Sequence, residues 1–296
     1  MTTTFVGICS IDLYSRIDRL PHNGETLKGI DLNRGFGGKA SNACAQFAFL
    51  ATQDEKPSLL TCVGKDSDGD SIRAHFQNIN INNDLVIVSE KQPTGLAICF
   101  VLDKGESAIV IHPCSLTPSM VRKYSDKISQ SKFVVTNFEI PIEVAAETLK
   151  IAHQGGAKTI LNFAPAPSTP CDKEIFRNTS ICIANEVEMA ALGTSVEELH
   201  SLGVECVIET LGGKGANIHV NGKDVIHVDA PKVEVVDTTG AGDSFLGSLT
   251  YFLSKGKSYE EASKFACFAA SQSVQRIGTQ QSYCRRGDEV LAPFFA

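Results

Sequence analysis

One stretch of ten residues near the C-terminal end combines side chains that could carry out chemistry. Residues 236–245 read VDTTGAGDSF and contain two aspartates, two threonines and two glycines. Such a stretch could be a connecting turn, a dinucleotide-binding loop, or a site at which an aspartate acts as a catalytic base. These interpretations differ in what the glycines do and in which element follows them.

The glycine spacing disfavours a dinucleotide-binding loop. Three segments are rich in glycine: residues 35–42 (GFGGKASN), 210–217 (TLGGKGAN) and 238–247 (TTGAGDSFLG). None contains the P-loop pattern GxxxxGK[ST], and the third segment lacks the spacing of GxGxxG. A dinucleotide fingerprint would also lie beside the first strand of its fold, whereas this segment lies near the C-terminal end.

The third glycine segment leads directly into apolar sequence, AGDSFLGSLTYFLSKG, for which we expect a helix. The first N–H groups of a helix have no partner within it, and the aligned peptide dipoles place partial positive charge there. Negative charge on a phosphoryl group in transfer would be stabilised at such a helix start. The segment therefore predicts an anion-binding loop.

Asp243, in the first turn of this expected helix, has two interpretations. It could be a helix-capping acid that contributes on the order of 1 kcal/mol to stability. It could instead be a general base that takes a proton from an attacking hydroxyl, a role worth about 10² to 10⁴ in rate. The second acid of the stretch, Asp237, favours the catalytic interpretation, because a helix cap does not require two acids.

Composition and charge limit the class of protein. The chain has 296 residues, of which 43% are hydrophobic and 21% charged, as in ordinary globular proteins. A net charge of -7 without a dense basic cluster argues against a nucleic-acid partner. We expect no membrane segment and a cytoplasmic location, because no signal-type start and no long apolar run are present. The ten cysteines show no CxxC spacing and are expected to be reduced and buried.

Apolar runs that resemble buried strands alternate with amphipathic, helix-like segments along the chain. This alternation is typical of a mostly parallel sheet with helices on both faces. Strands are expected at residues 4–11, 58–64, 133–138, 158–163, 180–186 and 206–212, and a strand-like run at 232–236; helices are expected at 40–52, 70–79, 141–156, 186–193 and 241–256.

Two stretches break this alternation, residues 12–35 and 94–112. Neither has a helical pattern, and the second is predicted to be a hairpin that turns at residues 103–106. We expect the two stretches to pair as a small antiparallel sheet, with an exposed face that serves as a lid or as a dimer surface.

Taken together, the glycine segments resemble the signatures of a known family. DTTGAGDSFLG is similar to the C-terminal signature of the ribokinase-like carbohydrate kinases of the PfkB type, and GFGGKASNAC to their N-terminal one. Further similar segments cover nearly the whole chain: LPHNGETLKG, VGKDSDGD, TNFEIP, NFAPAP, ANEVE, TLGGKG and SVQRIGTQQS. The resemblance implies an α/β fold, with a doubly wound, mostly parallel central sheet flanked by helices and a small β-sheet lid formed by two insertions. It also implies that residues 1–296 form a single kinase domain.

The resemblance implies a role for each matching residue. Asp243 would be the base, and Gly240, Ala241 and Gly242 would supply N–H groups to the charge that develops on the γ-phosphate. The sugar would be bound by Ser10, Asp12, Gly38, Lys39, Asn42, Glu139 and Asp243, and ATP by Asn185, Thr210, Gly212, Gly215 and Gly242. Glu188 would place Mg²⁺ through water, and K⁺ would be bound near Asp237, Thr239, Ser273, Arg276, Gly278 and Ser282.

Each of these residues also has an ordinary structural interpretation. Asp12 and Glu139 could be solvated charges at strand ends, Asn42 a helix N-terminal residue and Lys39 a surface cation. Asn185 and Glu188 could be a helix cap and an exposed first-turn acid. The TLGGKG segment could be a plain turn between strands.

Within the family, the ribokinase branch fits best. The resemblance therefore implies ATP-dependent phosphorylation of D-ribose to D-ribose 5-phosphate, with Mg²⁺ and K⁺, in a homodimer formed through the lid. Two departures affect the sugar pocket: Ser10 stands where an asparagine is usual, and the segment PCSLTPS after His112 is shorter than usual. The alternatives are a kinase for deoxyribose, fructose or a nucleoside, and a non-catalytic relative that binds sugar or nucleotide.

Overall fold

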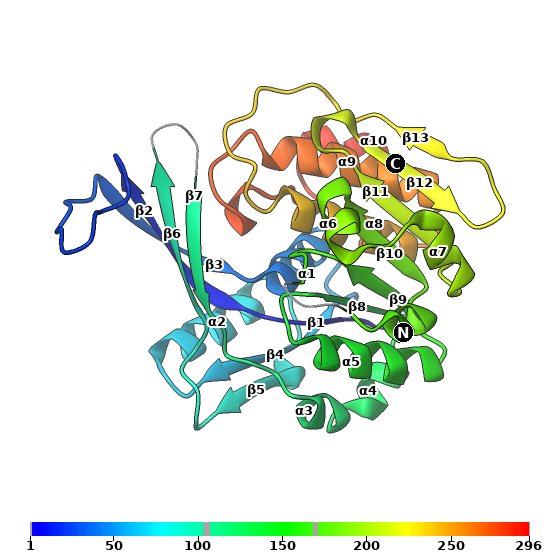
Figure 1. The fold of residues 1–296 in the computed structure, drawn as a ribbon, viewed down its shortest axis with the longest axis horizontal. Coiled ribbons are helices and arrows are strands. Elements are labelled where there is room, and N and C mark those ends of the chain that lie inside the picture. The colour runs from blue at the N-terminus through cyan, green and yellow to red at the C-terminus, as the bar shows by residue number, and fades with distance from the viewer. Residues whose placement is uncertain (1, 103–106, 168–170, 296) are drawn as a thin grey trace.

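The computed structural model describes residues 2–102, 107–167 and 171–295, and the predicted hairpin turn at 103–106 lies outside these ranges. A central sheet has the strand order β13-β12-β11-β10-β9-β8-β1-β4-β5 (Figure 1). Its strands are β1 (Thr3–Val6), β4 (Ser58–Gly64), β5 (Val86–Ser89), β8 (Phe133–Asn137), β9 (Lys158–Asn162), β10 (Ile181–Asn185), β11 (Cys206–Thr210), β12 (Ala216–Val220) and β13 (Ile226–Val228).

The central sheet is parallel from β11 to β5, and β12 and β13 extend it in the antiparallel sense. Its inner strands, among them β1, β4, β8 and β10, are buried on both faces, and successive side chains enter different cores. Phe5 belongs to the core on one face and Val6 to the core on the other. The predicted mostly parallel sheet is confirmed, and the continuous apolar character of its strands follows from burial on both faces.

Helices cover both faces of this sheet. The core on the first face contains side chains of α1 (Lys39–Leu50), α2 (Ser67–Asn78), α8 (Ala241–Ser254), α9 (Tyr259–Ser273) and α10 (Ala292–Phe295). The core on the second face contains side chains of α3 (Pro118–Arg122), α4 (Ser125–Ser129), α5 (Ile142–Gln154), α6 (Glu186–Leu192) and α7 (Val196–Ser201). No helix in the described ranges is both long and apolar enough to cross a membrane. The cysteine thiols are free, and all except the half-buried Cys171 are buried, as predicted.

A second, small sheet has the order β3-β2-β6-β7 and projects from one side of the molecule in Figure 1. Its strands are β2 (Ser10–Ile17), β3 (Asp31–Gly37), β6 (Leu96–Leu102) and β7 (Ser107–His112). The two stretches without helical pattern therefore pair as predicted. The expectation of a wholly antiparallel sheet is wrong, because β2 and β6 pair in parallel. These strands come from different insertions, and no hairpin forces them to run in opposite directions.

The strand predicted at residues 4–11 is two strands in two different sheets. β1 ends at Val6, and β2 begins at Ser10 in the small sheet. Gly7 marks the break: a Cβ there would lie 2.4 Å from the Cβ of Ala40, so only glycine allows α1 to approach this closely. The apolar run continues across the break because the residues on both sides of it are buried.

The strand-like run at residues 232–236 does not form a strand. Val235 and Val236 are 58% and 56% exposed. The Val236 N–H donates to the carbonyl of Val274, at the end of α9, at 2.8 Å. This segment is extended but borders a cavity, described below, instead of joining a sheet.

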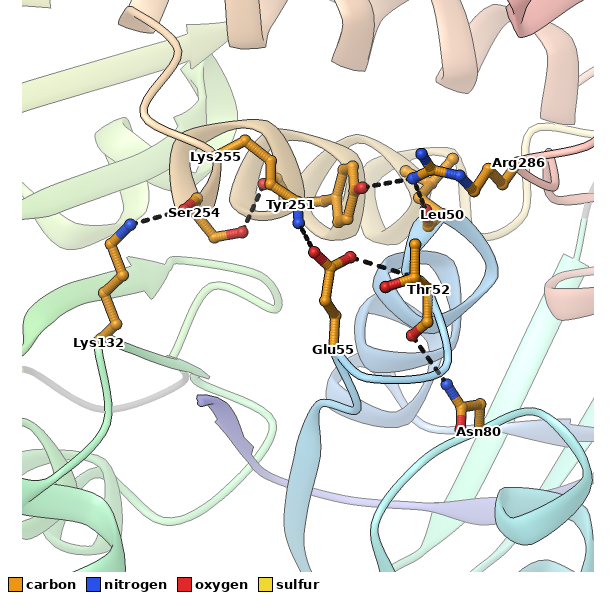
Figure 2. Close-up of polar contacts among 9 residues, drawn as sticks. All are labelled: Leu50, Thr52, Glu55, Asn80, Lys132, Tyr251, Ser254, Lys255 and Arg286. Carbon is orange, nitrogen blue, oxygen red and sulfur yellow. Dashed lines mark hydrogen bonds and ion pairs between the residues drawn. The ribbon is translucent and has the colours of Figure 1, made fainter. Parts of the chain in front are cut away.

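Helices α1 and α8 pack side by side, although one begins at residue 39 and the other at residue 241. A Cβ on Gly247 would lie 2.3 Å from the carbonyl oxygen of Ala43, so the two backbones are in close contact. Figure 2 shows Arg286 at the C-terminal ends of both helices, where its Nη1 donates to the Leu50 carbonyl at 3.2 Å and to the Tyr251 hydroxyl at 2.9 Å. Because the C-terminal ends are joined in this way, the two helix N-termini lie together at the other end.

Candidate active site

Polar residues gather at the carboxyl ends of the parallel strands, where α/β sheets bind ligands. Asn137 of β8 is in register with Asn162 of β9, and Asn185 of β10 is in register with Thr210 of β11. The N-terminal ends of α1 and α8 carry Asn42 and Asp243, which are in contact with each other. The candidate site lies at this edge of the sheet.

The start of α8 has the geometry expected of an anion-binding loop. Gly240 is the N-cap residue with a φ of 76°, and a Cβ there would lie 2.6 Å from the hydroxyl of Tyr283. The Ala241 N–H donates to the Thr238 carbonyl at 3.2 Å. Among the described residues, the N–H groups of Gly240, Gly242 and Asp243 have no hydrogen-bond partner. These groups are available to negative charge, whereas the N–H of Ala241 is engaged in the turn.

Asp243 is not a helix cap, because no side chain among the described residues caps the start of α8. Its carboxylate is 6% exposed and accepts a hydrogen bond of 2.9 Å from Nδ2 of Asn42. Burial raises the pKa of Asp243, whereas the charge of Lys39 and the bond from Asn42 lower it. A buried carboxylate with one donor and one nearby cation can accept a proton from a bound hydroxyl.

Asp12 is a buried acid and not a solvated strand end. Its two carboxylate oxygens accept hydrogen bonds from the Ser10 hydroxyl at 2.7 Å and from the Tyr14 hydroxyl at 3.1 Å. Burial raises its pKa, and both hydroxyls oppose that shift. Ser10 has one hydroxyl proton, and it donates this proton to Asp12 and so orients the carboxylate.

Lys39 and Glu139 meet at the N-terminus of α1. Its N-cap residue, Gly38, has a φ of 90°, and a Cβ there would lie 2.4 Å from the carbonyl oxygen of Ile8. The Lys39 N–H donates to Glu139 at 2.8 Å. Burial raises the pKa of Glu139 to about 7. The negative charge of Asp243, more than that of Glu139, raises the pKa of Lys39, whose side chain is half-buried and not fully exposed to solvent.

A cavity of about 520 Å³ lies beside the start of α8. All five residues predicted to bind ATP line it: Asn185, Thr210, Gly212, Gly215 and Gly242. The sequence prediction did not include its apolar part, which is made by Ala230, Pro231, Val233, Phe245, Cys267, Ala270 and Val274. Gly242, next in the chain to Asp243, is one of the residues that line the cavity, so a nucleotide in it could present a phosphate to Asp243.

Comparison with known proteins agrees with this arrangement. The model of the pfkB family of carbohydrate kinases matches residues 3–284. The chain belongs to this family. It is 34% identical to a ribokinase of Mus musculus, an alignment that covers 98% of this chain and 94% of that protein. A ribokinase of Thermotoga maritima has a TM-score of 0.88 and 30% identity, with 99% of each chain covered. The structure of Arabidopsis thaliana ribokinase complexed with ribose and ATP has a TM-score of 0.85 and 28% identity, with 96% of each chain covered.

In this pfkB family member, the residues predicted to place the nucleotide phosphates and Mg²⁺ contact each other. Asn185 and Glu188 form a capping box at the start of α6: the Glu188 N–H donates to Asn185 at 2.8 Å, and the Asn185 N–H donates to Oε2 of Glu188 at 2.9 Å. The interpretation as a helix cap is therefore right, but Glu188 is half-buried and not an exposed acid. The capping box leaves Oε1 of Glu188 without a protein donor in the described ranges, and burial raises the pKa of this carboxyl.

The loop predicted to hold a cation joins two distant parts of this kinase. Asp237 accepts the Thr239 N–H at 2.9 Å through one oxygen and the Gly278 N–H at 2.8 Å through the other. Ser273 and Ser282 donate to the carbonyls of Ala270 and Thr279. Within the described ranges, the carbonyls of Asp237, Thr239, Arg276 and Gly278 accept no hydrogen bond. These four carbonyl oxygens are thus unengaged.

Several site residues of this pfkB kinase were missed from the sequence. Tyr14 supports Asp12, and Tyr283 donates to the Gly240 carbonyl at 2.9 Å. Gln280 and His75 form a chain of hydrogen bonds that ends at Asn42. Gln280 lies within the SVQRIGTQQS segment, but no sequence pattern indicates which residue it contacts across the fold.

Proposed function

We propose that this chain phosphorylates D-ribose with ATP to give D-ribose 5-phosphate. The observation that carries the proposal is the position of Asp243, which is buried beside Asn42 and Lys39 and follows Gly242, a residue that lines the 520 Å³ cavity. Similarity to ribokinases over nearly the whole length supports ribose as the sugar. The ribokinase complexed with ribose and ATP supports both substrates.

In the proposed reaction, the sugar hydroxyl attacks the γ-phosphorus of ATP as Asp243 accepts its proton. The oxygen–phosphorus bond to ADP breaks, and ADP leaves with the bonding electrons. The N–H groups at the start of α8 and the ammonium of Lys39 stabilise the charge on the transferred phosphoryl group. The chain thus contributes positioning and charge stabilisation, which phosphoryl transfer requires.

The sugar is proposed to bind between the small sheet and α1. A polyol needs several fixed donors and acceptors, and Asp12, Asn42, Lys39 and Glu139 supply them from three elements. Gly38 allows close approach of the backbone. The small sheet is proposed to act as a lid within a single kinase domain of residues 1–296.

Mg²⁺ is proposed to bind near Glu188. The Oε1 atom of this residue takes no part in the capping box, and the residue is half-buried. Mg²⁺ keeps several waters and needs few protein oxygens, so one acid acting through water fits it. Bound Mg²⁺ would neutralise charge on the nucleotide phosphates.

K⁺ is proposed to bind to the loop of Asp237, Thr239, Ser273, Arg276, Gly278 and Ser282, mainly through carbonyl oxygens. Support comes from the unengaged carbonyls in this loop and from the bond of Gly278 to Asp237. Such an ion would fix the loop that precedes the anion-binding N–H groups without contact to substrate.

A homodimer is proposed to form through the small sheet. Exposed apolar side chains gather on it: Leu32 is 68% exposed, Ile109 57%, Val110 49% and Ile111 38%. These side chains lie on the two edge strands, β3 and β7. Exposed apolar side chains are common at interaction surfaces, and pairing with a second copy along an edge would remove some of them from water.

The direct test is to measure ATP-dependent phosphorylation of ribose, deoxyribose, fructose and adenosine, with Asp243→Asn as the matched variant. We expect the highest kcat/KM with ribose, and a fall in kcat of about 10² to 10⁴ in the variant, at an unchanged melting temperature. A higher kcat/KM with another sugar or with adenosine would identify that compound, and not ribose, as the substrate. Absence of turnover with every compound, or full activity of Asp243→Asn, would overturn the proposed chemistry.

A further inference from the structure

A chain of hydrogen bonds leads from α2 to the proposed base. Nε2 of Gln280 donates to Oδ1 of Asn42 at 3.0 Å and to the hydroxyl of Ser41 at 3.2 Å. Its Oε1 lies 2.8 Å from Nε2 of His75. Gln280 and Asn42 are each only 4% exposed. This hydrogen-bond relay, His75–Gln280–Asn42–Asp243, brings together α2, the 3₁₀ turn η4 (Gln280–Ser282), α1 and α8.

The ionised base fixes the direction of every bond in the relay. A carboxylate only accepts hydrogen bonds, so Asn42 must turn its amide nitrogen to Asp243 and its oxygen to Gln280. Gln280 then donates with its nitrogen, and its oxygen must accept, so Nε2 of His75 carries a proton. Each dipole points its positive end toward Asp243, which favours the ionised carboxylate.

His75 is held in place from the small sheet. The ring of Phe36, in β3, stacks on the imidazole with centroids 3.8 Å apart and an angle of 6° between the rings. The hydroxyl of Thr279, next to Gln280, donates to the Phe36 carbonyl at 3.2 Å. Burial lowers the pKa of His75, so the neutral form, which has one N–H to donate, is favoured. The relay thus connects the small sheet, which contacts His75, to the proposed base, Asp243.

We propose that Gln280 and His75 are positioning residues. They orient the Asn42 amide so that it donates to Asp243 and keeps this carboxylate ionised and in a fixed orientation. The proposal rests on the proposed function, since it assigns Asp243 the role of base. Neither Gln280 nor His75 needs to touch substrate. Without Gln280, the Asn42 amide is free to rotate, and its oxygen can face the carboxylate.

Steady-state kinetics with ribose and ATP test this relay. In Gln280→Met, which keeps the length of the side chain and removes its hydrogen bonds, kcat should fall by about tenfold, with smaller changes in both KM values. His75→Leu should lower kcat in the same direction, and His75→Gln, which retains a donor, should restore it. Thermal denaturation controls for loss of fold.

A double-mutant cycle separates positioning from a purely structural role. In an Asn42→Ala background the relay has already lost the member that donates to Asp243, so Gln280→Met should change kcat by less than about twofold. If Gln280 only supports the fold, its loss should cost the same factor in both backgrounds. Additive effects, or wild-type kcat in the single variant, would overturn the proposal.

A second measurement needs no turnover. The side-chain amide signal of Asn42 in ¹⁵N-labelled protein, assigned by its loss in Asn42→Ala, should shift with pH in wild type and not in Asp243→Asn. In Gln280→Met it should exchange faster with solvent; a signal unchanged from wild type would overturn the relay. Wild type that fails to phosphorylate any sugar but shows this NMR behaviour would contradict the proposed function and leave the relay supported.

Discussion

The side-chain amide of Asn42 donates a hydrogen bond of 2.9 Å to the carboxylate of Asp243, although 201 positions separate these residues in the chain. Each residue lies near the start of a helix, and the two helices pack side by side. The N-terminal and C-terminal glycine segments thus form one site. Asp243 thus accepts a hydrogen bond from the N-terminal segment, and its neighbour Gly242 lines the cavity.

The two glycines that flank Ala241 should respond differently to alanine. Gly240→Ala should lower stability by about 1–2 kcal/mol, because alanine disfavours positive φ and the new Cβ would lie 2.6 Å from the Tyr283 hydroxyl. Gly242→Ala has open space and should keep its stability while raising KM for ATP, since the methyl group lies beside an anion-binding N–H. Chemical denaturation and kinetics distinguish the two. Equal losses of stability would contradict the assigned geometry.

Glu188 can be tested without loss of its structural role. Glutamine at this position still completes a capping box, so Glu188→Gln should keep the melting temperature of wild type. It should increase the Mg²⁺ concentration needed for half-maximal rate by about tenfold. Asn185→Ala is the complementary variant, in which stability should fall by about 1 kcal/mol. A wild-type Mg²⁺ titration in Glu188→Gln would remove this residue from metal placement.

Exchange of K⁺ for Na⁺ tests the proposed cation loop. The rate in Na⁺ should be lower by about tenfold, or ~1.4 kcal/mol, because the loop before Gly240 loses its geometry. Asp237→Ala, which removes the acceptor for the Thr239 and Gly278 N–H groups, should be slow in both salts. Asp229→Asn, at a side chain 96% exposed, provides a charge-matched control. Equal rates of wild type in K⁺ and Na⁺ would exclude the cation site.

Glu139 should make stability fall as the pH rises toward neutrality. Burial raises the pKa of this carboxyl from 4.5 to about 7, so the folded chain holds a proton that the unfolded chain releases. This contribution is complete below about pH 4.5 and is lost as the pH passes about 7. In Glu139→Gln the free energy of unfolding should vary less over this range, by on the order of 1 kcal/mol. The exposed Glu289 serves for a control Gln variant; parallel pH curves for wild type and Glu139→Gln would refute the assignment.

Local sequence patterns predicted most of the central sheet and the start of α8, because both are specified by residues that lie close together in the chain. A continuous apolar run identifies a strand buried on both faces, and glycines before an apolar helix identify an anion-binding loop. The same patterns could not locate the break at Gly7, where the run stays buried while the chain passes to another sheet. They also predicted a strand at 232–236, where apolar residues line a cavity.

Side-chain partners across the fold were beyond the reach of these patterns. Nothing local to Gln280 shows that it bonds Asn42, and nothing local to His75 shows that it bonds Gln280. The parallel pairing of β2 with β6 likewise depends on where each insertion leaves the central sheet. The resemblance to a family suggested the candidate site residues, and the structure shows the contacts that those residues make.

The pairing of α1 with α8 has a consequence during protein synthesis. β1 lies between β8 and β4, so the first strand to leave the ribosome must wait for residue 133 before one of its two neighbours exists. The amide of Asn42 must wait longer, until Asp243 and then Gln280 emerge. A nascent chain can therefore collapse and acquire much of its sheet while remaining catalytically silent. If Asp243 is the base, phosphoryl transfer requires that the segment containing Asp243 and Gln280 has already been translated.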